Sequence, residues 1–216
     1  MSIIDLLTEP TGQPQVAGAV YGAVVAVVSS TEDPDELGRV KLQYPWLKDN
    51  SESDWARVAG FMAGPDRGAL FRPEVGDEVL VLFEHGDMRF PYVIGALWNG
   101  QDTPPAEKAA DADNDIRLIK SRSGHLVILD DTADGEKIEI IGSGGKDRIT
   151  VDCAENTITI TTGKDIVLSA PDGKLALEAK ELEVSASSSA KITCDANIEI
   201  KASGTLTLQG QTININ

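Results

Sequence analysis

The second half of the chain carries a repeated pattern of hydrophobic and polar positions. Pairs of apolar residues separated by a single residue recur from Ile138/Ile140 to Ile213/Ile215, with a mean spacing of about eight residues. Side chains alternate between two faces along a strand, so each pair predicts a short strand with one apolar face. Most of the residues between and beside the pairs are polar, chiefly Thr, Glu, Asp, Lys or Ser, and the turns are rich in Gly, Ala, Ser and Asp.

Strands this short cannot form a hydrophobic core alone. Two buried side chains at about 1.5–3 kcal/mol each only offset the entropy of ordering roughly eight residues. The core must therefore come from stacking many repeats. A single-chain β-solenoid normally needs a longer repeat to make every corner, whereas three chains wound together can close a triangular prism. No aromatic residue follows Trp98, which suits a narrow axis.

The pattern thus favours an intertwined trimeric β-helix over a single-chain solenoid. Its predicted trimer core consists of Ile149, Val151, Ile158, Ile160, Ile166, Leu168, Leu175, Leu177, Leu182, Val184, Ile192, Cys194, Ile198, Ile200, Leu206 and Leu208.

The first half predicts a small β-barrel. Five apolar or alternating runs, separated by turn clusters, occupy 20–28, 38–44, 55–59, 78–83 and 92–97. Five short strands in about 80 residues, with no helical period, are typical of an OB-fold barrel. A generic five-stranded barrel is the alternative. The fold class is therefore all-β, with an OB-fold barrel followed by the β-helix.

Composition places the boundary between the two halves. All ten aromatic residues precede position 99, and nine of the ten prolines precede position 106. We therefore expect an N-terminal arm at 1–18 that contacts a hub or the barrel, an OB-fold domain at 19–98, a linker at 99–115 and the β-helix at 116–216. The segment 3–7 can be a short helix or an extended arm.

Net charge and hydropathy argue against several classes of function. A net charge of −16 argues against a broad nucleic-acid surface, which needs clustered Lys and Arg. The most apolar run, at 17–28, is too short to span a bilayer, and the N-terminus lacks the features of a secretory signal. We therefore expect synthesis and folding in a cytoplasm. Cys153 and Cys194 belong to no metal-binding motif and are predicted to be small buried apolar residues.

No group of residues predicts catalysis, a cofactor or a metal site. His85 and His125 lie in turn sequences 40 residues apart. The acidic segment 32–36 lacks the spacing of an EF-hand and predicts a solvated loop. The glycine-rich segment 142–146 lies between two strands, lacks the Walker spacing and predicts a turn. We therefore expect a structural protein and not an enzyme.

Several segments resemble the gp5/VgrG-type central spike proteins of contractile baseplates, a family that includes phage baseplate assembly protein V. In the first half these are GRVKLQYPWL at 38–47, WARVA at 55–59, PEVGDEVLV at 73–81, FEHGD at 83–87 and PYVIGALWN at 91–99. In the second half, SRSGH at 121–125 and the acidic pairs after it resemble the entry into the family's triple-stranded β-helix.

The resemblance implies a homotrimeric needle that sits on a hub at the tube tip and pierces the target cell envelope, with transient membrane contact. It implies a baseplate component of a phage, bacteriocin or related injection particle, assembled in the bacterial cytoplasm and delivered into the target envelope. Full-length VgrG proteins carry a hub domain before the barrel. This chain has about nineteen residues there, so the expected hub is a separate protein at the OB-fold end.

Two further departures bear on function. The linker 99–115 has no room for the lysozyme domain that some relatives carry, and no histidine follows His125 to form the His-x-His iron site of some spike tips. We therefore expect Ile213, Ile215 and Asn216 to form a platform on which a PAAR-like cap docks.

Two other function classes remain as alternatives. An OB-fold nucleic-acid-binding protein with a solenoid oligomerisation tail needs a basic groove, whereas residues 1–137 carry a net charge near −12. A solenoid adhesin or polysaccharide lyase needs a secretion signal and aromatic or carboxylate clusters on the rod.

Overall fold

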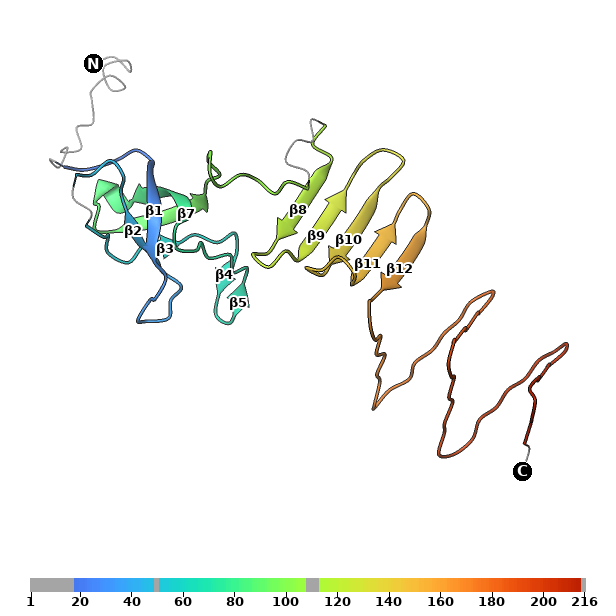
Figure 1. Ribbon diagram of the computed structural model, residues 1–216. Coiled ribbons are helices and arrows are strands. Elements are labelled where there is room, and N and C mark those ends of the chain that lie inside the picture. The colour runs from blue at the N-terminus through green and yellow to red at the C-terminus, as the bar shows by residue number, and fades with distance from the viewer. Residues whose placement is uncertain (1–17, 49–50, 108–112, 215–216) are drawn as a thin grey trace, which may run out of the picture. The chain divides into compact units, whose positions relative to one another are not determined.

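The computed structural model describes residues 18–48, 51–107 and 113–214 (Figure 1). The chain divides into two units, Met1–Gly163 and Lys164–Asn216. All the regular structure of the described residues is β, apart from one 3-10 turn, η1 (Glu84–Gly86). The predicted all-β class is therefore confirmed.

The first sheet has the strands expected of an OB fold. Its order is β2-β1-β6-β7-β3, and all its pairs are antiparallel except β3 with β7. Each strand overlaps one of the five predicted runs. The strands are β1 (Val24–Ser30), β2 (Lys41–Gln43), β3 (Arg57–Val58), β6 (Glu78–Phe83) and β7 (Pro91–Ala96).

Alternation of side chains along these strands builds the OB core. In β1, Ala26 and Val28 are buried, and in β6, Val79 and Val81 are buried. The residues between them point to the other side of the sheet. Leu42 from β2 completes the densest part of this core.

A hairpin between β3 and β6 was not predicted. It pairs β4 (Ala63–Gly64) with β5 (Arg67–Gly68), and its composition of Gly, Pro, Asp and Arg led us to expect only a turn. Its two strands have two residues each, too few to show an alternating pattern.

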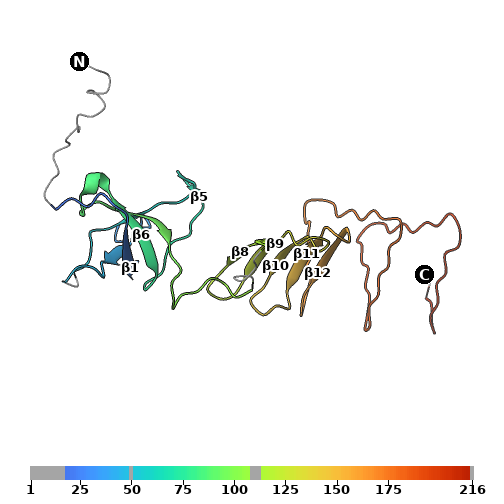
Figure 2. The same cartoon turned by 90° about the horizontal axis from the view of Figure 1, so that it is seen from above.

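The second sheet is an antiparallel meander of five strands that lie side by side in chain order (Figures 1 and 2). Five-residue strands are joined by short turns, so each strand pairs with the one before it. The strands are β8 (Ile116–Lys120), β9 (Leu126–Asp130), β10 (Lys137–Ile141), β11 (Arg148–Asp152) and β12 (Thr157–Thr161).

The second unit differs from this meander. Its described residues, 164–214, run as extended chain with turns and contain no strand. The β-helix was predicted over 116–216, with its repeat of apolar pairs beginning at Ile138. Within the single chain, strand pairing extends to β12, and no described residue after it belongs to a strand.

Candidate functional site

The most conspicuous surface of the second sheet is an uncovered apolar face, which we call the apolar face. Residues directly opposite each other in an antiparallel ladder point to the same side. The register therefore aligns two rows across the five strands. One row is Ile119, Val127, Ile140, Ile149 and Ile160, and the other is Arg117, Leu129, Ile138, Val151 and Ile158.

Nine of these ten side chains are aliphatic, and eight of the nine are 41–72% exposed. A contiguous exposed apolar patch of this kind is typical of an interaction surface.

The opposite face of the same sheet, which we call the polar face, carries mostly polar side chains, together with aliphatic ones such as the buried Ile128 and Ile141. Its central carboxylate, Glu139, is buried and accepts a hydrogen bond from the Thr150 hydroxyl at 3.4 Å. Arg148 and Lys137 approach the same carboxylate at 3.5 Å and 3.8 Å. Because burying a charge without partners is costly, these contacts hold the polar face in place.

The predicted core residues fall into two groups. The structure brings Ile149, Val151, Ile158 and Ile160 together on the apolar face. The same spacing of two was present at Val127 and Leu129, one strand before the first predicted pair, and it could have extended the prediction.

The structure does not bring the remaining predicted residues together within one chain. Their aliphatic side chains, with Ile213, are 49–81% exposed. They are Ile166, Leu168, Leu175, Leu177, Leu182, Val184, Ile192, Ile198, Ile200, Leu206 and Leu208. Within residues 164–214, the Gly173 N–H donates to Ala170 O at 3.2 Å. Ile215 and Asn216, predicted as part of the tip platform, lie outside the described residues.

Both cysteines are exposed in the single chain. The Cys153 N–H donates to Glu136 O at 2.9 Å, which extends the β11 ladder by one residue and keeps Cys153 in phase with Val151. Cys194 lies in the second unit, with its Sγ 3.4 Å from Asn197 O. The burial predicted for them requires other copies of the chain.

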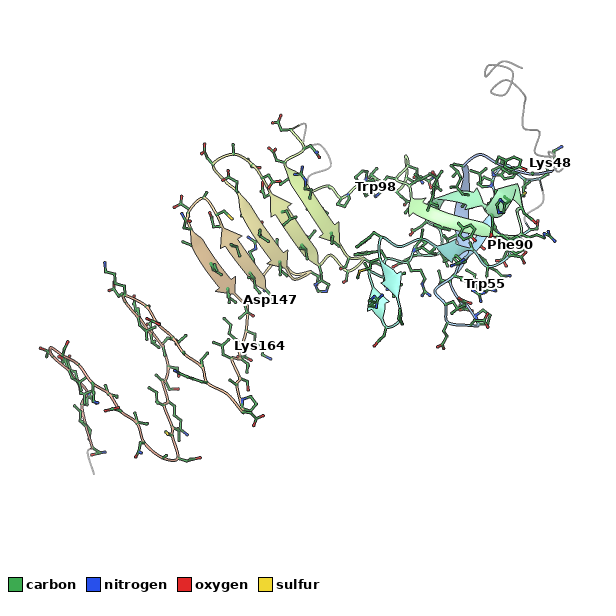
Figure 3. All side chains as sticks on the ribbon, turned by 180° about the vertical axis from the view of Figure 1, so that it is seen from behind. Lys48, Trp55, Phe90, Trp98, Asp147 and Lys164 are labelled. Carbon is green, nitrogen blue, oxygen red and sulfur yellow. The ribbon has the colours of Figure 1, made fainter. Side chains whose placement is uncertain are left out.

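The glycine-rich segment 142–146 forms a turn, as predicted. Gly142 N–H donates to Asp147 O at 2.8 Å and closes the β10–β11 connection. The Asp147 carboxylate accepts the Thr162 hydroxyl at 2.8 Å and Gly163 N–H at 3.1 Å. The Thr162 bond, more than the other, lowers the pKa of Asp147. Asp147 thereby fixes the chain where it leaves β12, just before Lys164 (Figure 3).

The OB domain presents cations against aromatic rings, the combination that an OB-fold nucleic-acid binder would use. The Arg39 guanidinium and the Lys41 ammonium lie 5.8 Å and 5.5 Å from the centre of the Trp55 ring (Figure 3). Arg57 lies 5.5 Å from the ring of Tyr92.

Carboxylates neutralise this surface. Arg39 forms ion pairs with Asp33 and Asp35 at 2.6 Å and 2.5 Å, and Lys41 pairs with Glu52 at 3.1 Å. Phosphate binding depends on cations that are free to replace counterions. The arrangement therefore does not favour the nucleic-acid alternative.

The acidic segment 32–36 is more structured than the solvated loop we predicted. The Asp33 side chain is only 1% exposed. Its carboxylate accepts backbone N–H groups of Asp35, Leu37 and Arg39 at 2.9–3.2 Å. The side-chain bonds from Arg39 hold the pKa of Asp33 well below its usual range. Asp33 thus organises the β1–β2 connection.

The two histidines lie in turns, as predicted. His85 has a φ of 51° inside η1, and Gly86 after it has a φ of 80°. Asp87 ends the turn, with its N–H donating to Glu84 O at 3.0 Å. His125 ends the β8–β9 turn, and its Nδ1 accepts the Ser143 N–H at 3.2 Å.

The described residues, 18–48, 51–107 and 113–214, offer neither a metal-binding cluster nor a membrane-spanning helix. No three His, Cys, Asp or Glu residues there are grouped to hold a metal ion. No helix there has the length and apolar character needed to cross a membrane.

Comparison with known proteins shows what the OB domain is similar to. Residues 24–98 match the Type VI secretion system/phage-baseplate injector OB domain. Over 101 residues, 45% of this chain, it is 36% identical to the actin cross-linking toxin VgrG1 of Vibrio cholerae, of which it covers 9%. Over 100 residues, 44% of the chain, it is 34% identical to the spike protein VgrG2a of Pseudomonas aeruginosa, of which it covers 12%.

A longer match extends beyond the OB domain. The chain is 26% identical over 167 residues, 73% of its length, to the Type VI secretion system spike protein VgrG1a of Pseudomonas aeruginosa. It covers 25% of that protein. The chain thus spans between about a tenth and a quarter of the length of these relatives.

Proposed function

We propose that the chain is the central spike of a contractile injection machine, because residues 24–98 match the Type VI secretion system/phage-baseplate injector OB domain. In this proposal three copies form a needle that sits on the hub at the tube tip and pierces the target cell envelope. The gp5/VgrG-type resemblance of the sequence and the spike-protein relatives support this function.

The observation that carries the proposal is the apolar surface that a single chain leaves open. The chain exposes 18356 Å². A compact monomer of 23.0 kDa exposes only about 9,600 Å². The excess includes the apolar face and the aliphatic side chains of residues 164–214. A soluble monomer rarely leaves such patches in water, so other chains must cover them.

Three copies of this chain supply the cover. The described residues 165–214 contain no strand, and they carry exposed aliphatic side chains in pairs separated by one residue. Strands from neighbouring copies can satisfy the backbone groups of these residues, and the aliphatic side chains can then meet on a common axis. A rod built in this way has polar residues outside and is stiff along its length, which suits a device for pushing.

The partners follow from the same reasoning. We propose a separate hub protein at the OB-fold end, a PAAR-like cap at the Ile213 end and transient contact with the target membrane. The role is structural, without catalysis of its own. The carboxylates that pair with the cations near Trp55 support the expectation that the chain does not bind nucleic acid.

The mass of the purified chain in solution tests this proposal. Sedimentation equilibrium should give three times the chain mass of 23.0 kDa, and the species should persist in SDS without heating. A monomer mass across the accessible concentration range would exclude the needle. A stable dimer would equally rule out the threefold arrangement.

A further inference from the structure

The unpredicted hairpin between β3 and β6 is a defined structure and not an irregular loop. Ala63 pairs with Gly68 and Gly64 pairs with Arg67 around a two-residue turn in which Asp66 has a φ of 52°. A side chain at position 68 would place its Cβ 2.7 Å from Met62 O, so the close approach of the two strands requires glycine there.

The base of this hairpin carries four large apolar side chains in water. Phe61, Met62, Leu70 and Phe71 are 53–85% exposed, and the rings of Phe61 and Phe71 lie 6.1 Å apart. Aromatic residues and methionine are enriched where protein interfaces form. We call these four residues the hairpin cluster. Figure 1 shows the hairpin projecting from the OB sheet that carries it.

Strand direction places the hairpin cluster at a particular end of the OB domain. β3 runs parallel to β7, with Val58 opposite Val93, and the Ala59 N–H donates to Val93 O at 2.8 Å. The chain therefore enters the hairpin at the end of the sheet where β7 finishes. The linker 99–115 leaves β7 at this same end, on its way to β8.

We propose that the hairpin cluster of each copy packs against the OB domain of a neighbouring copy, so that three hairpins form an apolar collar around the entry to the spike. This inference rests on the proposed trimer. A threefold spike must bring three linkers together at the end of the OB domains from which they leave. The hairpin cluster of each copy therefore lies where the three copies approach one another most closely. All three clusters are apolar, so each is suited to contact with a neighbouring copy.

Site-specific photo-crosslinking of the purified full-length chain tests the collar. Benzoylphenylalanine, a photoreactive phenylalanine analogue, replaces Phe61 or Phe71 in separate variants. Phe90 is the matched control, because it is an equally apolar, 53% exposed phenylalanine that immediately precedes β7 and so lies at the opposite end of the sheet. Sedimentation equilibrium is measured on each variant before irradiation.

A trimer mass with covalent dimers and trimers from positions 61 and 71, and none above background from position 90, supports the collar. A trimer mass with adducts only inside one chain would overturn the collar and leave the spike intact. Equal cross-linking from position 90, or cross-linking that starts only when another baseplate protein is added, would also overturn it. A monomer mass would remove the trimer itself and the collar with it.

Discussion

Replacing Ile160 with aspartate perturbs the apolar face at one point and leaves the polar face unchanged. Ile160 lies in β12 directly opposite Ile149, and 55% of its surface is exposed in the single chain. Its neighbour Thr159 points to the other face, where it lies opposite Thr150. Thr159→Asp is therefore a control with the same charge, one residue away, on the side that the proposed trimer leaves in water.

The magnitude follows from what each copy would bury. A fully buried isoleucine contributes about 1.5–3 kcal/mol, so the exposed half of Ile160 contributes about 1 kcal/mol per copy on assembly. A carboxylate at that position must in addition lose its water without a partner, which costs at least several kcal/mol. Over three copies the loss is on the order of 10 kcal/mol, comparable with the entire stability of a typical domain.

The assay compares the two variants by sedimentation velocity and by unheated SDS electrophoresis. Ile160→Asp should sediment as a monomer with a folded OB domain, while Thr159→Asp should form the same SDS-resistant trimer as the parent chain. Tryptophan fluorescence checks the OB domain, because all three tryptophans precede position 99. Equal behaviour of the two variants would refute the assignment of the two faces.

Four further predictions concern other parts of the chain. The Arg39 side chain lowers the pKa of Asp33, so the stability that this ionised carboxylate provides is complete above pH about 4 and is lost as the pH falls toward the lowered pKa. Asp33→Asn should therefore flatten the acid side of the unfolding curve followed by tryptophan fluorescence, and a parallel shift would contradict this. Gly86→Ala should cost about 1–2 kcal/mol in urea unfolding because φ is +80° there, whereas Gly100→Ala should be neutral. Purified chain should not clear peptidoglycan, and muramidase activity in a clean preparation would disprove the structural role. Deleting 211–216 should leave the trimer mass unchanged and abolish binding of a PAAR-type cap, so capture of the cap by the truncated chain would exclude a tip platform.

The OB fold could be predicted because its pattern is local. The alternation around Ala26 and Val28, and around Val79 and Val81, depends only on which face of one sheet is buried. Turn residues then mark where each strand stops. The hairpin cluster could not be predicted in this way, because β4 and β5 are too short to alternate and pack against no core of their own.

In the second half of the chain, the side-chain pattern predicts which residues share a face but not how the strands pair. The sequence identifies Ile149 and Ile160 as members of one face, and the register of β11 and β12 places them opposite each other. The sequence does not reveal that the self-paired strands end at β12. Strand starts at Lys137, Arg148 and Thr157 leave room for hairpin turns, whereas several of the later repeats are shorter. Side-chain pattern is the same in both parts, so only turn length distinguishes them.

The change from a self-paired meander to a segment without strands after β12 has a consequence for how the proposed needle assembles. Repeats of nearly identical composition can pair in several registers, and a slip of one repeat would still bury aliphatic side chains. In the proposed trimer, the meander folds within each copy first and docks through the apolar face, which aligns the three chains before residues 164–214 begin to pair. The segments 164–214 of the three copies then pair in sequence, starting next to the meander and ending at the C-terminus. In this scheme the meander sets the register of the three chains, and the tip is the last part of the proposed needle to form.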